Sequence, residues 1–276
     1  MAVMRCAVLG SPIAHSLSPV LYRAAYAELG LDWTYDAVEV DAPGLEEFVS
    51  GLDDSWRGLS LTMPLKRAVI PLLHELDAWA AVSSSANTVV LEGGRRLGHN
   101  TDVPGAVNAL AERVDGPLTT AVVLGGGATA ASVLLALSEI GCRQARLLVR
   151  NPARAVDTLS ALDRHGRGPG IHVGRLGDEF EVPDIVVSTI PADAQGPALV
   201  EIAAAARVVF DVLYDPWPTP LAAAAASSAR IVVSGLDLLV HQAALQVRLM
   251  TGNDVAIPVL RAAGERALAD RGGDAG

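Results

Sequence analysis

The sequence predicts an α/β protein built from two α/β domains. Its 276 residues are 51% hydrophobic but only 4% aromatic, so the core must be aliphatic and alanine-rich, which suits helices packed on a parallel sheet. Beyond Asp102, short apolar segments recur with helical stretches between several of them, in the βαβ rhythm of a parallel sheet. The length allows one large domain or two of ordinary size.

Strand and helix patterns alternate in the first hundred residues. Ser18-Pro19 begins a helix, with Ser18 as N-cap and proline at the first helical position, and Gly30 ends it. Glu92-Gly93-Gly94 is a hairpin signal. The expected order is strand Met4–Leu9, that helix, strand Tyr35–Val40, helix Pro43–Phe48, strand Gly58–Thr62, a helix opened by Met63-Pro64, and hairpin strands Val89–Leu91 and Arg95–Leu97.

The remaining elements follow at wider spacing. We expect helices over Pro104–Val114 and Leu221–Ala229, and an amphipathic helix over Leu236–Met250. The expected strands are Ala121–Leu124, Arg146–Arg150, Asp184–Thr189, Arg207–Leu213 and Arg230–Ser234. The predicted domains span residues 1–103 and 104–235, with residues 236–270 returning to the first. Arg271–Gly276 is expected to fray.

Composition argues against several classes of function. The formal net charge is −10 and the arginines are scattered among acidic residues, so we expect no nucleic-acid partner. The uncharged segment Gly116–Ser138 is long enough to cross a membrane, but three consecutive glycines interrupt it, and a strand, a turn and a buried helix explain it better. Cys6 and Cys142 lack metal-ligand spacing, so we expect no metal. The absence of a signal peptide predicts a cytoplasmic protein.

Lys66 is the only lysine among 21 basic residues. A guanidinium stays protonated at any working pH, whereas an ammonium can give or take a proton. Lys66 is therefore a candidate for proton chemistry, although most lysines are simply solvated.

A glycine-rich turn indicates a dinucleotide site. Leu124-Gly125-Gly126-Gly127-Ala128-Thr129-Ala130 lies between a predicted strand and a predicted helix and fits G-x-G-x-x-A. The first glycine makes the turn, the second lets the backbone approach a pyrophosphate, and the last small residue lets helix and strand pack closely. The next strand ends at Arg150, with Arg154 four residues on and no acid nearby, which favours NADP over NAD.

Two polar motifs have both structural and functional interpretations. Ser16 and Ser18 stand near a helix start, where an N-cap needs only one hydroxyl and two would suit a carboxylate. Asn100-Thr101-Asp102 precedes the second domain, where Asp102 is either a helix cap or a residue facing a cleft.

Together these residues resemble the shikimate dehydrogenase family over nearly the whole chain. The resemblance rests on eight segments in the family's order: Gly10–Pro19, Leu61–Lys66, Ala86–Thr88, Asn100–Asp102, the glycine turn, Ser188–Pro191, Asp211–Pro216 and Gly235–Gln242. It implies reversible reduction of 3-dehydroshikimate to shikimate by NADPH, a step of chorismate and aromatic amino-acid biosynthesis. It also implies a Rossmann-like nucleotide domain and a monomer or homodimer.

The resemblance assigns roles to residues of this chain. Lys66 and Asp102 are implied to be the catalytic pair. Ser16, Ser18 and Thr62 would hold the substrate carboxylate, and Asn87, Tyr214 and Gln242 would contact the ring hydroxyls or line their pocket. The implied NADP-binding residues are Gly125, Gly126, Gly127, Ala128, Thr129, Arg150, Arg154, Thr189 and Gly235.

This chain departs from the family pattern at five positions. Ser60 stands where the family often has Asn, which shortens or removes one substrate contact. Ala131 replaces an Arg often found after the glycine turn, Val149 and Asn151 flank Arg150 where the family has Asn and Thr, and Leu238 replaces a usual Met. The changes at Ala131 and Val149 weaken the expected grip on NADP.

Three alternatives remain open. The nearest is a relative that acts on quinate, or on both quinate and shikimate, or one that uses NAD. Dehydrogenases of similar build that act on amino acids or folates are disfavoured because Ser16, Ser18 and Thr62 suit a small ring acid. A regulator that binds NADP without turnover would not need Lys66 or Asp102.

Overall fold

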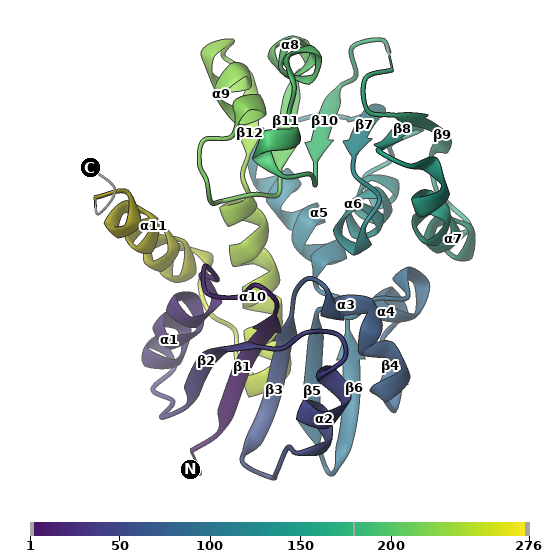
Figure 1. Ribbon diagram of the computed structural model, residues 1–276. Coiled ribbons are helices and arrows are strands. Elements are labelled where there is room, and N and C mark those ends of the chain that lie inside the picture. Colours follow the sequence, from purple (N-terminus) through teal and green to yellow (C-terminus); the bar gives the residue numbers. More distant parts are fainter. Residues whose placement is uncertain (1–2, 179, 274–276) are drawn as a thin grey trace. The chain divides into compact units, whose positions relative to one another are not determined.

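The computed structural model describes residues 3–178 and 180–273, and it divides the chain into two compact units. The first unit comprises Met1–Thr101 and Leu239–Gly276, and the second comprises Asp102–Leu238. The predicted fold class is confirmed, with a parallel-sheet domain following an α/β domain and the C-terminal helices belonging to the first unit (Figure 1).

The first unit is built on a mixed six-stranded sheet of order β2-β1-β3-β5-β6-β4. β1 pairs in parallel with β2 and β3, whereas β5 is antiparallel to both β3 and β6. The strands are β1 (Arg5–Gly10), β2 (Thr34–Glu39), β3 (Trp56–Leu61), β4 (Glu75–Leu76), β5 (Thr88–Glu92) and β6 (Arg95–His99).

Helices complete this unit. The apolar core beside β1 and β3 includes Leu45, Leu65 and Ala80, so α2, α3 and α4 pack on that face. α10 packs against β3, where a Cβ on Gly58 would lie 2.8 Å from the Met250 side chain. The helices are α1 (Ser18–Glu28), α2 (Leu45–Ser50), α3 (Leu65–Ala68), the 3₁₀ turn η1 (Ile70–Leu72), α4 (Ala78–Ser83), α10 (Gly235–Thr251) and α11 (Ile257–Gly273).

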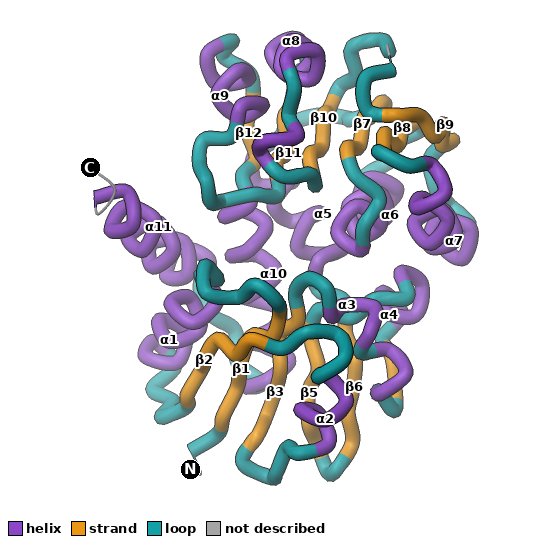
Figure 2. Tube along the Cα trace, viewed as in Figure 1, coloured by secondary structure: helices purple, strands orange, loops and turns teal. Residues whose placement is uncertain are grey.

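The second unit is built on a six-stranded sheet whose strand order, β12-β11-β10-β7-β8-β9, can be followed in Figure 2. All of its paired strands are parallel. Its elements are α5 (Asp102–Arg113), β7 (Thr120–Leu124), α6 (Ala128–Glu139), β8 (Gln144–Val149), η2 (Pro152–Ala155), α7 (Val156–His165), β9 (Gly170–Arg175), β10 (Ile185–Ser188), η3 (Ala192–Ala194), α8 (Pro197–Ala205), β11 (Val208–Asp211), α9 (Pro220–Ser227) and β12 (Ile231–Val233). Leu199 of α8 and Leu221 of α9 share a core with Val122 and Leu148 of the sheet.

The structure differs from the sequence expectations in a few elements. β4, α4 and β9 were not expected: β4 and α4 are short, and glycines interrupt the apolar pattern of β9. The N-cap of α1 is Leu17 rather than Ser18, and α5 begins at Asp102 itself. α11 continues to Gly273, while the rest of the segment expected to fray, residues 274–276, lies outside the described residues. No helix in the described ranges has the length and apolar composition needed to cross a bilayer.

Candidate functional site

The loops that carry the predicted site residues of the first unit lie at one edge of its sheet. Register pairs Leu9 with Leu61, Ser60 with Thr88, and Thr88 with His99. β1, β3 and β6 therefore end at the edge where antiparallel β5 begins. The segments that leave the sheet there contain the predicted residues of the Ser16, Thr62, Asn87 and Asn100 motifs.

The turn after β1 approaches the turn after β3 closely. A Cβ on Gly10 would lie 2.4 Å from Cγ2 of Thr62 and 3.0 Å from the carbonyl oxygen of Met63. The backbone N–H of Ser11 donates to that same carbonyl at 3.0 Å. Only glycine fits at position 10, and the approach places Thr62 next to the loop that leads into α1.

Ser16 and Ser18 lie at the start of α1. Ser16 Oγ accepts a hydrogen bond from the Ser18 N–H at 3.2 Å, and the N-cap residue of α1, Leu17, makes no side-chain cap hydrogen bond. Ser18 is buried and Ser16 is partly exposed. The hydroxyl proton of Ser16 is not used in this bond, which leaves a donor for an anion near the helix N-terminus.

Lys66 lies in α3, directly after the loop that follows β3. Its neighbour Leu65 is fully buried and fastens this short helix to the core. The carbonyl oxygen of Lys66 accepts a hydrogen bond from the Ala86 N–H at 2.8 Å. The Lys66 backbone is therefore fixed beside the residue that precedes Asn87.

Asn87 is the hub of the first unit's polar contacts and is 1% exposed. Its Nδ2 donates to Oε1 of Gln242 at 2.7 Å and to Oγ1 of Thr101 at 2.9 Å. Its Oδ1 accepts from the Thr101 N–H at 2.8 Å and from the Thr88 hydroxyl at 2.9 Å. Two predicted site residues are thus in direct contact, and Thr101 is fixed immediately before Asp102, which is buried.

The glycine turn of the second unit requires glycine at its first position. Gly125 has φ of +103°, and a Cβ there would lie 2.3 Å from Oγ1 of Thr189. The Thr189 hydroxyl donates to the Leu124 carbonyl at 2.8 Å, and the Thr158 hydroxyl of α7 donates to the Gly126 carbonyl at 3.0 Å. Contacts from the end of β10 and from α7 therefore hold the turn.

The start of α6 fits a dinucleotide pyrophosphate. Its N-cap is Gly127, which makes no side-chain cap hydrogen bond, and a Cβ on Gly127 would meet no described atom within 4 Å. The first N–H groups of the helix, including those of Ala128 and Thr129, have no intrahelical partner. Open space in front of unpaired N–H groups and a positive dipole end suits a phosphate.

The segment after β8 carries the residues expected to choose between dinucleotides. Arg150 directly follows β8 and is exposed. Asn151 caps η2, because its Oδ1 accepts from the Ala153 N–H at 3.1 Å. Arg154 lies in η2, and its side chain is outside the described part of the chain. No acidic residue occurs from position 149 to position 156.

Tyr214 lies in the loop between β11 and α9, which a buried carboxylate closes at its base. Asp211 accepts hydrogen bonds from the Leu213 N–H at 3.2 Å and from the Thr219 hydroxyl at 2.7 Å, at the two ends of the loop. Gln195 Nε2 donates to the same carboxylate at 2.8 Å. Burial raises the pKa of Asp211 above its ordinary value.

Gly235 begins α10 against the same loop. A Cβ there would lie 2.3 Å from the Val212 carbonyl oxygen and 2.5 Å from the Leu213 carbonyl oxygen. The Gly235 N–H also donates to the Leu213 carbonyl at 3.0 Å. This contact gives Gly235 a packing role beside the loop of Tyr214.

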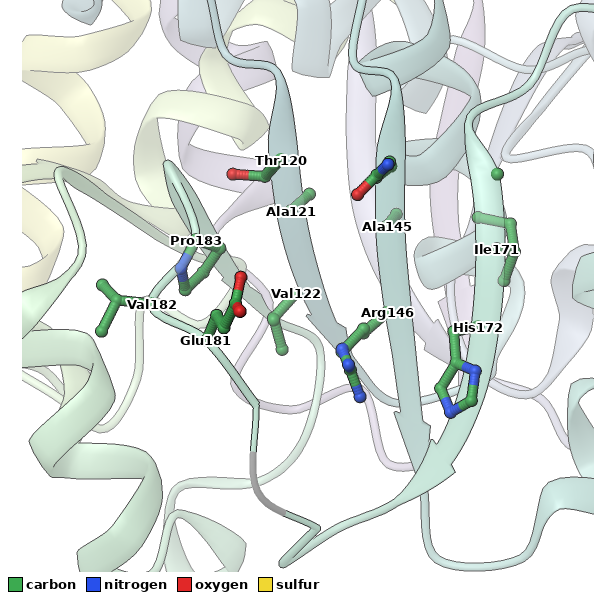
Figure 3. Close-up of a pocket in the computed structure, with 12 residues that line it drawn as sticks. Thr120, Ala121, Val122, Ala145, Arg146, Ile171, His172, Glu181, Val182 and Pro183 are labelled. Atoms are coloured by element: carbon green, nitrogen blue, oxygen red, sulfur yellow. The ribbon is translucent and has the colours of Figure 1, made fainter.

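A separate cavity of about 420 Å³ lies along β7, β8 and β9 (Figure 3). Arg146 and His172 are register partners on β8 and β9 and line it together with Glu181. Its β7 residues, Thr120 to Val122, come from the first part of that strand, whereas the glycine turn follows the end of the strand. The cavity is therefore not the predicted dinucleotide site. Among the described residues, no group of three His, Cys, Asp or Glu side chains is placed to hold a metal ion.

Three supporting residues were not apparent as such from the sequence. Gln246 donates to the Asn87 carbonyl, Thr158 holds the glycine turn, and Asp211 closes the Tyr214 loop. Gln246 follows Gln242 by four residues on one helix, and that spacing was its available signal. Nothing in the sequence pattern reveals which backbone groups Thr158 and Asp211 hold.

Two family models match the chain. The shikimate dehydrogenase substrate binding domain matches residues 8–89, and the shikimate 5'-dehydrogenase C-terminal domain matches residues 235–263. The shikimate dehydrogenase (NADP(+)) of Moorella thermoacetica is 36% identical over 266 residues, covering 92% of this chain and 90% of that protein. The corresponding protein of Streptococcus equi subsp. zooepidemicus is also 36% identical, covering 92% and 93%.

Solved structures agree with these relatives. Shikimate dehydrogenase from Mycobacterium tuberculosis is 36% identical and superposes with a TM-score of 0.87, covering 95% of this chain and 99% of that one. Shikimate 5-dehydrogenase from Thermus thermophilus, solved in complex with NADP(H) and shikimate, is 30% identical with a TM-score of 0.81, covering 96% and 100%.

Proposed function

Because the chain belongs to the shikimate dehydrogenase family, we propose that it catalyses the reversible reduction of 3-dehydroshikimate to shikimate with NADPH, in the biosynthesis of chorismate and the aromatic amino acids. The protein is an NADP-dependent oxidoreductase. Beyond family membership, the hydrogen bond between Asn87 and Gln242 carries the proposal. It joins two motifs that lie 155 residues apart in the sequence.

The substrate carboxylate is proposed to bind Ser16, Ser18 and Thr62. The free hydroxyl proton of Ser16 and the positive end of α1 support this assignment, since both favour an anion. Asn87, Gln242 and Tyr214 are proposed to contact the ring hydroxyls or line their pocket.

Lys66 and Asp102 are proposed to be the catalytic pair. When bound, NADPH supplies the hydride that reduces the ring ketone. The Lys66 ammonium stabilises the negative charge that develops on the ketone oxygen and donates a proton to that oxygen. Asp102 orients the ammonium and binds a hydroxyl. In shikimate oxidation Lys66 takes the same proton back.

The cofactor is proposed to lie at the start of α6. Gly125, Gly126, Gly127, Ala128 and Thr129 would cradle its pyrophosphate, with Thr189 and Gly235 beside it. Arg150 and Arg154 would meet the 2′-phosphate. The uncapped N-terminus of α6 and the lack of an acid near Arg150 support NADP.

The test is the oxidation of NADPH, followed by its absorbance, with 3-dehydroshikimate as substrate. We expect turnover that depends on both compounds, and the reverse reaction with shikimate and NADP. Efficient oxidation of quinate would instead place the chain with dual-substrate relatives. Cofactor binding without turnover would make it a regulator. The monomeric or homodimeric state and the cytoplasmic location expected from the sequence remain proposals.

A further inference from the structure

We propose that a buried, polarised hydrogen-bond network acts through Asn87 to position Gln242 for the substrate, and that Ser60, Thr88 and Gln246 are its positioning residues. The proposal rests on the proposed function, because it assigns a supporting apparatus to the same site. It also assigns the atom that Gln242 offers to a ligand.

The network joins five elements of the first unit: α1, β2, β3, β5 and α10. Ser60 on β3 and Thr88 on β5 are register partners, and Gln246 lies on α10. Its polar members are buried in every case, with exposed fractions of at most 5%: Tyr22, Tyr35, Ser60, Asn87, Thr88 and Gln246. Buried polar groups of this kind specify a unique arrangement when every one is satisfied.

The backbone carbonyl of Asn87 determines which groups donate and which accept in the hydrogen bonds around Gln246. Gln246 lies 3.1 Å from the carbonyl oxygen of Asn87, which can only accept, so the Gln246 atom there is Nε2. Oε1 of Gln246 therefore faces the Ser60 and Tyr22 hydroxyls, and both must donate to it; the Ser60 distance is 2.7 Å. Since the Ser60 proton is used there, the Tyr35 hydroxyl donates to Ser60, at 2.6 Å.

The backbone N–H of Thr101 determines which groups donate and which accept in the hydrogen bonds of Asn87 and Gln242. The Thr101 N–H lies 2.8 Å from the Asn87 side chain and can only donate, so the Asn87 atom there is Oδ1. Nδ2 of Asn87 then points at Gln242 and receives Oε1 as its acceptor. Gln242 is consequently turned so that its Nε2 is the atom offered to a ligand. The ligand atom that meets it must be an acceptor, such as a hydroxyl or ketone oxygen.

Thr88 connects the hydrogen bonds around Gln246 to those around Asn87. Its hydroxyl accepts from Gln246 Nε2 at 2.6 Å and donates to Asn87 Oδ1 at 2.9 Å. Burial raises the pKa values of Tyr22 and Tyr35, so both phenols stay protonated and keep donating. Ser60, the position where the family often has Asn, has its hydroxyl engaged by buried partners, so its role here is to support the amides.

The test compares two substitutions at Thr88 in the full-length protein. Thr88→Val keeps the shape and the β-branch but removes the hydroxyl, whereas Thr88→Ser keeps the hydroxyl and loses a methyl group. We expect Thr88→Val to raise the KM for 3-dehydroshikimate and the Kd for shikimate about tenfold, the effect of one lost buried hydrogen bond. Thr88→Ser should change both by less than about threefold. The KM for NADPH should stay within about twofold in each.

A packing role predicts the reverse order, because serine leaves a cavity and valine does not. Thr88→Ser binding shikimate more weakly than Thr88→Val, or Thr88→Val binding normally, would overturn the proposal. A matched pair of tyrosine substitutions tests the part of the network farthest from Gln242. Tyr35→Phe should weaken shikimate binding, and Tyr26→Phe should not, since the Tyr26 hydroxyl has no hydrogen bond to the network among the described residues. If the unaltered protein bound no shikimate, the proposed function itself would fail.

Discussion

The carbonyl oxygen of Lys66 accepts a hydrogen bond from the Ala86 N–H at 2.8 Å, which ties α3 to the start of β5. The bond joins the segment of the chain's only lysine to the residue before Asn87, the hub of the buried amides. The bond fixes the point from which the long lysine side chain extends. This arrangement makes Lys66 the first residue to test.

Lys66→Ala is expected to lower kcat for 3-dehydroshikimate reduction by roughly 10²-fold or more, the scale of lost acid–base or charge stabilisation. Lys66→Arg should not restore activity, because a guanidinium does not release its proton. Steady-state kinetics with purified variants give both values. A Lys66→Arg enzyme with near-normal kcat would exclude proton transfer by Lys66.

Asp102 is expected to act as one unit with Lys66. The kcat loss of the Lys66→Ala, Asp102→Ala double variant should be smaller than the product of the two single losses, because residues that act together share one effect. The four kcat values of the double-mutant cycle measure this coupling. Losses that simply multiply would mean that the two residues act independently.

Ser16→Ala is expected to raise the KM for shikimate, by about 1–3 kcal/mol of binding free energy for an unpaired polar group, with a smaller effect on kcat. The variant also removes the oxygen that accepts from the Ser18 N–H. Thermal unfolding of the free protein therefore serves as the control for a loosened helix start. An unchanged KM would remove Ser16 from the carboxylate site. Quinate oxidised as efficiently as shikimate by the unaltered protein would favour a dual-substrate assignment.

Most of the fold follows from local signals. The glycine turn at Gly125 and the apolar strands that follow β7 made the second unit's parallel sheet predictable. β4 has two residues and α4 has six, so neither offers enough periodicity to detect. β9 was not expected because Gly170 and Gly174 enclose only two apolar residues, Ile171 and Val173, and glycine is depleted in strands. β4, α4 and β9 form because neighbouring strands and helices of the folded chain offer them hydrogen-bond and packing partners.

The polar apparatus is less predictable than the fold. The sequence suggests that Ser60 makes a weakened contact to the substrate. In the folded chain its hydroxyl instead forms hydrogen bonds with side chains of β2, α1 and α10. Asp211 likewise stands in a recognisable motif, but its partner Gln195 lies 16 residues away on another segment. Such contacts depend on tertiary packing, which local patterns do not encode.

Asp211→Asn is expected to change how stability depends on pH. The pKa of Asp211 is raised in the folded protein from an ordinary value of 3.8, so the folded state binds its proton more tightly than the unfolded state. Stability from this group is then present below the ordinary value and is lost as pH rises through the folded pKa. Urea unfolding at several pH values from about 4 upward should show the unaltered protein losing stability relative to Asp211→Asn. A difference that is constant with pH would contradict the raised pKa.

Arg150→Ala is expected to reduce kcat/KM with NADPH more than with NADH. Arg150 is exposed directly after β8, and no acidic residue from position 149 to 156 would bind a bare ribose. A guanidinium pairs well with a dianionic phosphate, so its loss should cost about tenfold or more with NADPH and little with NADH. Ala131 and Val149 are both buried, and neither side chain has a polar group to offer the cofactor. The preference of the unaltered protein for NADPH over NADH should therefore be smaller than a full set of polar contacts to the cofactor would give. Measuring kcat/KM with both cofactors, before and after the substitution, tests this. If Arg150→Ala weakened NADH and NADPH equally, the 2′-phosphate would not be recognised at Arg150, and cofactor choice would have to depend on other residues of the second unit.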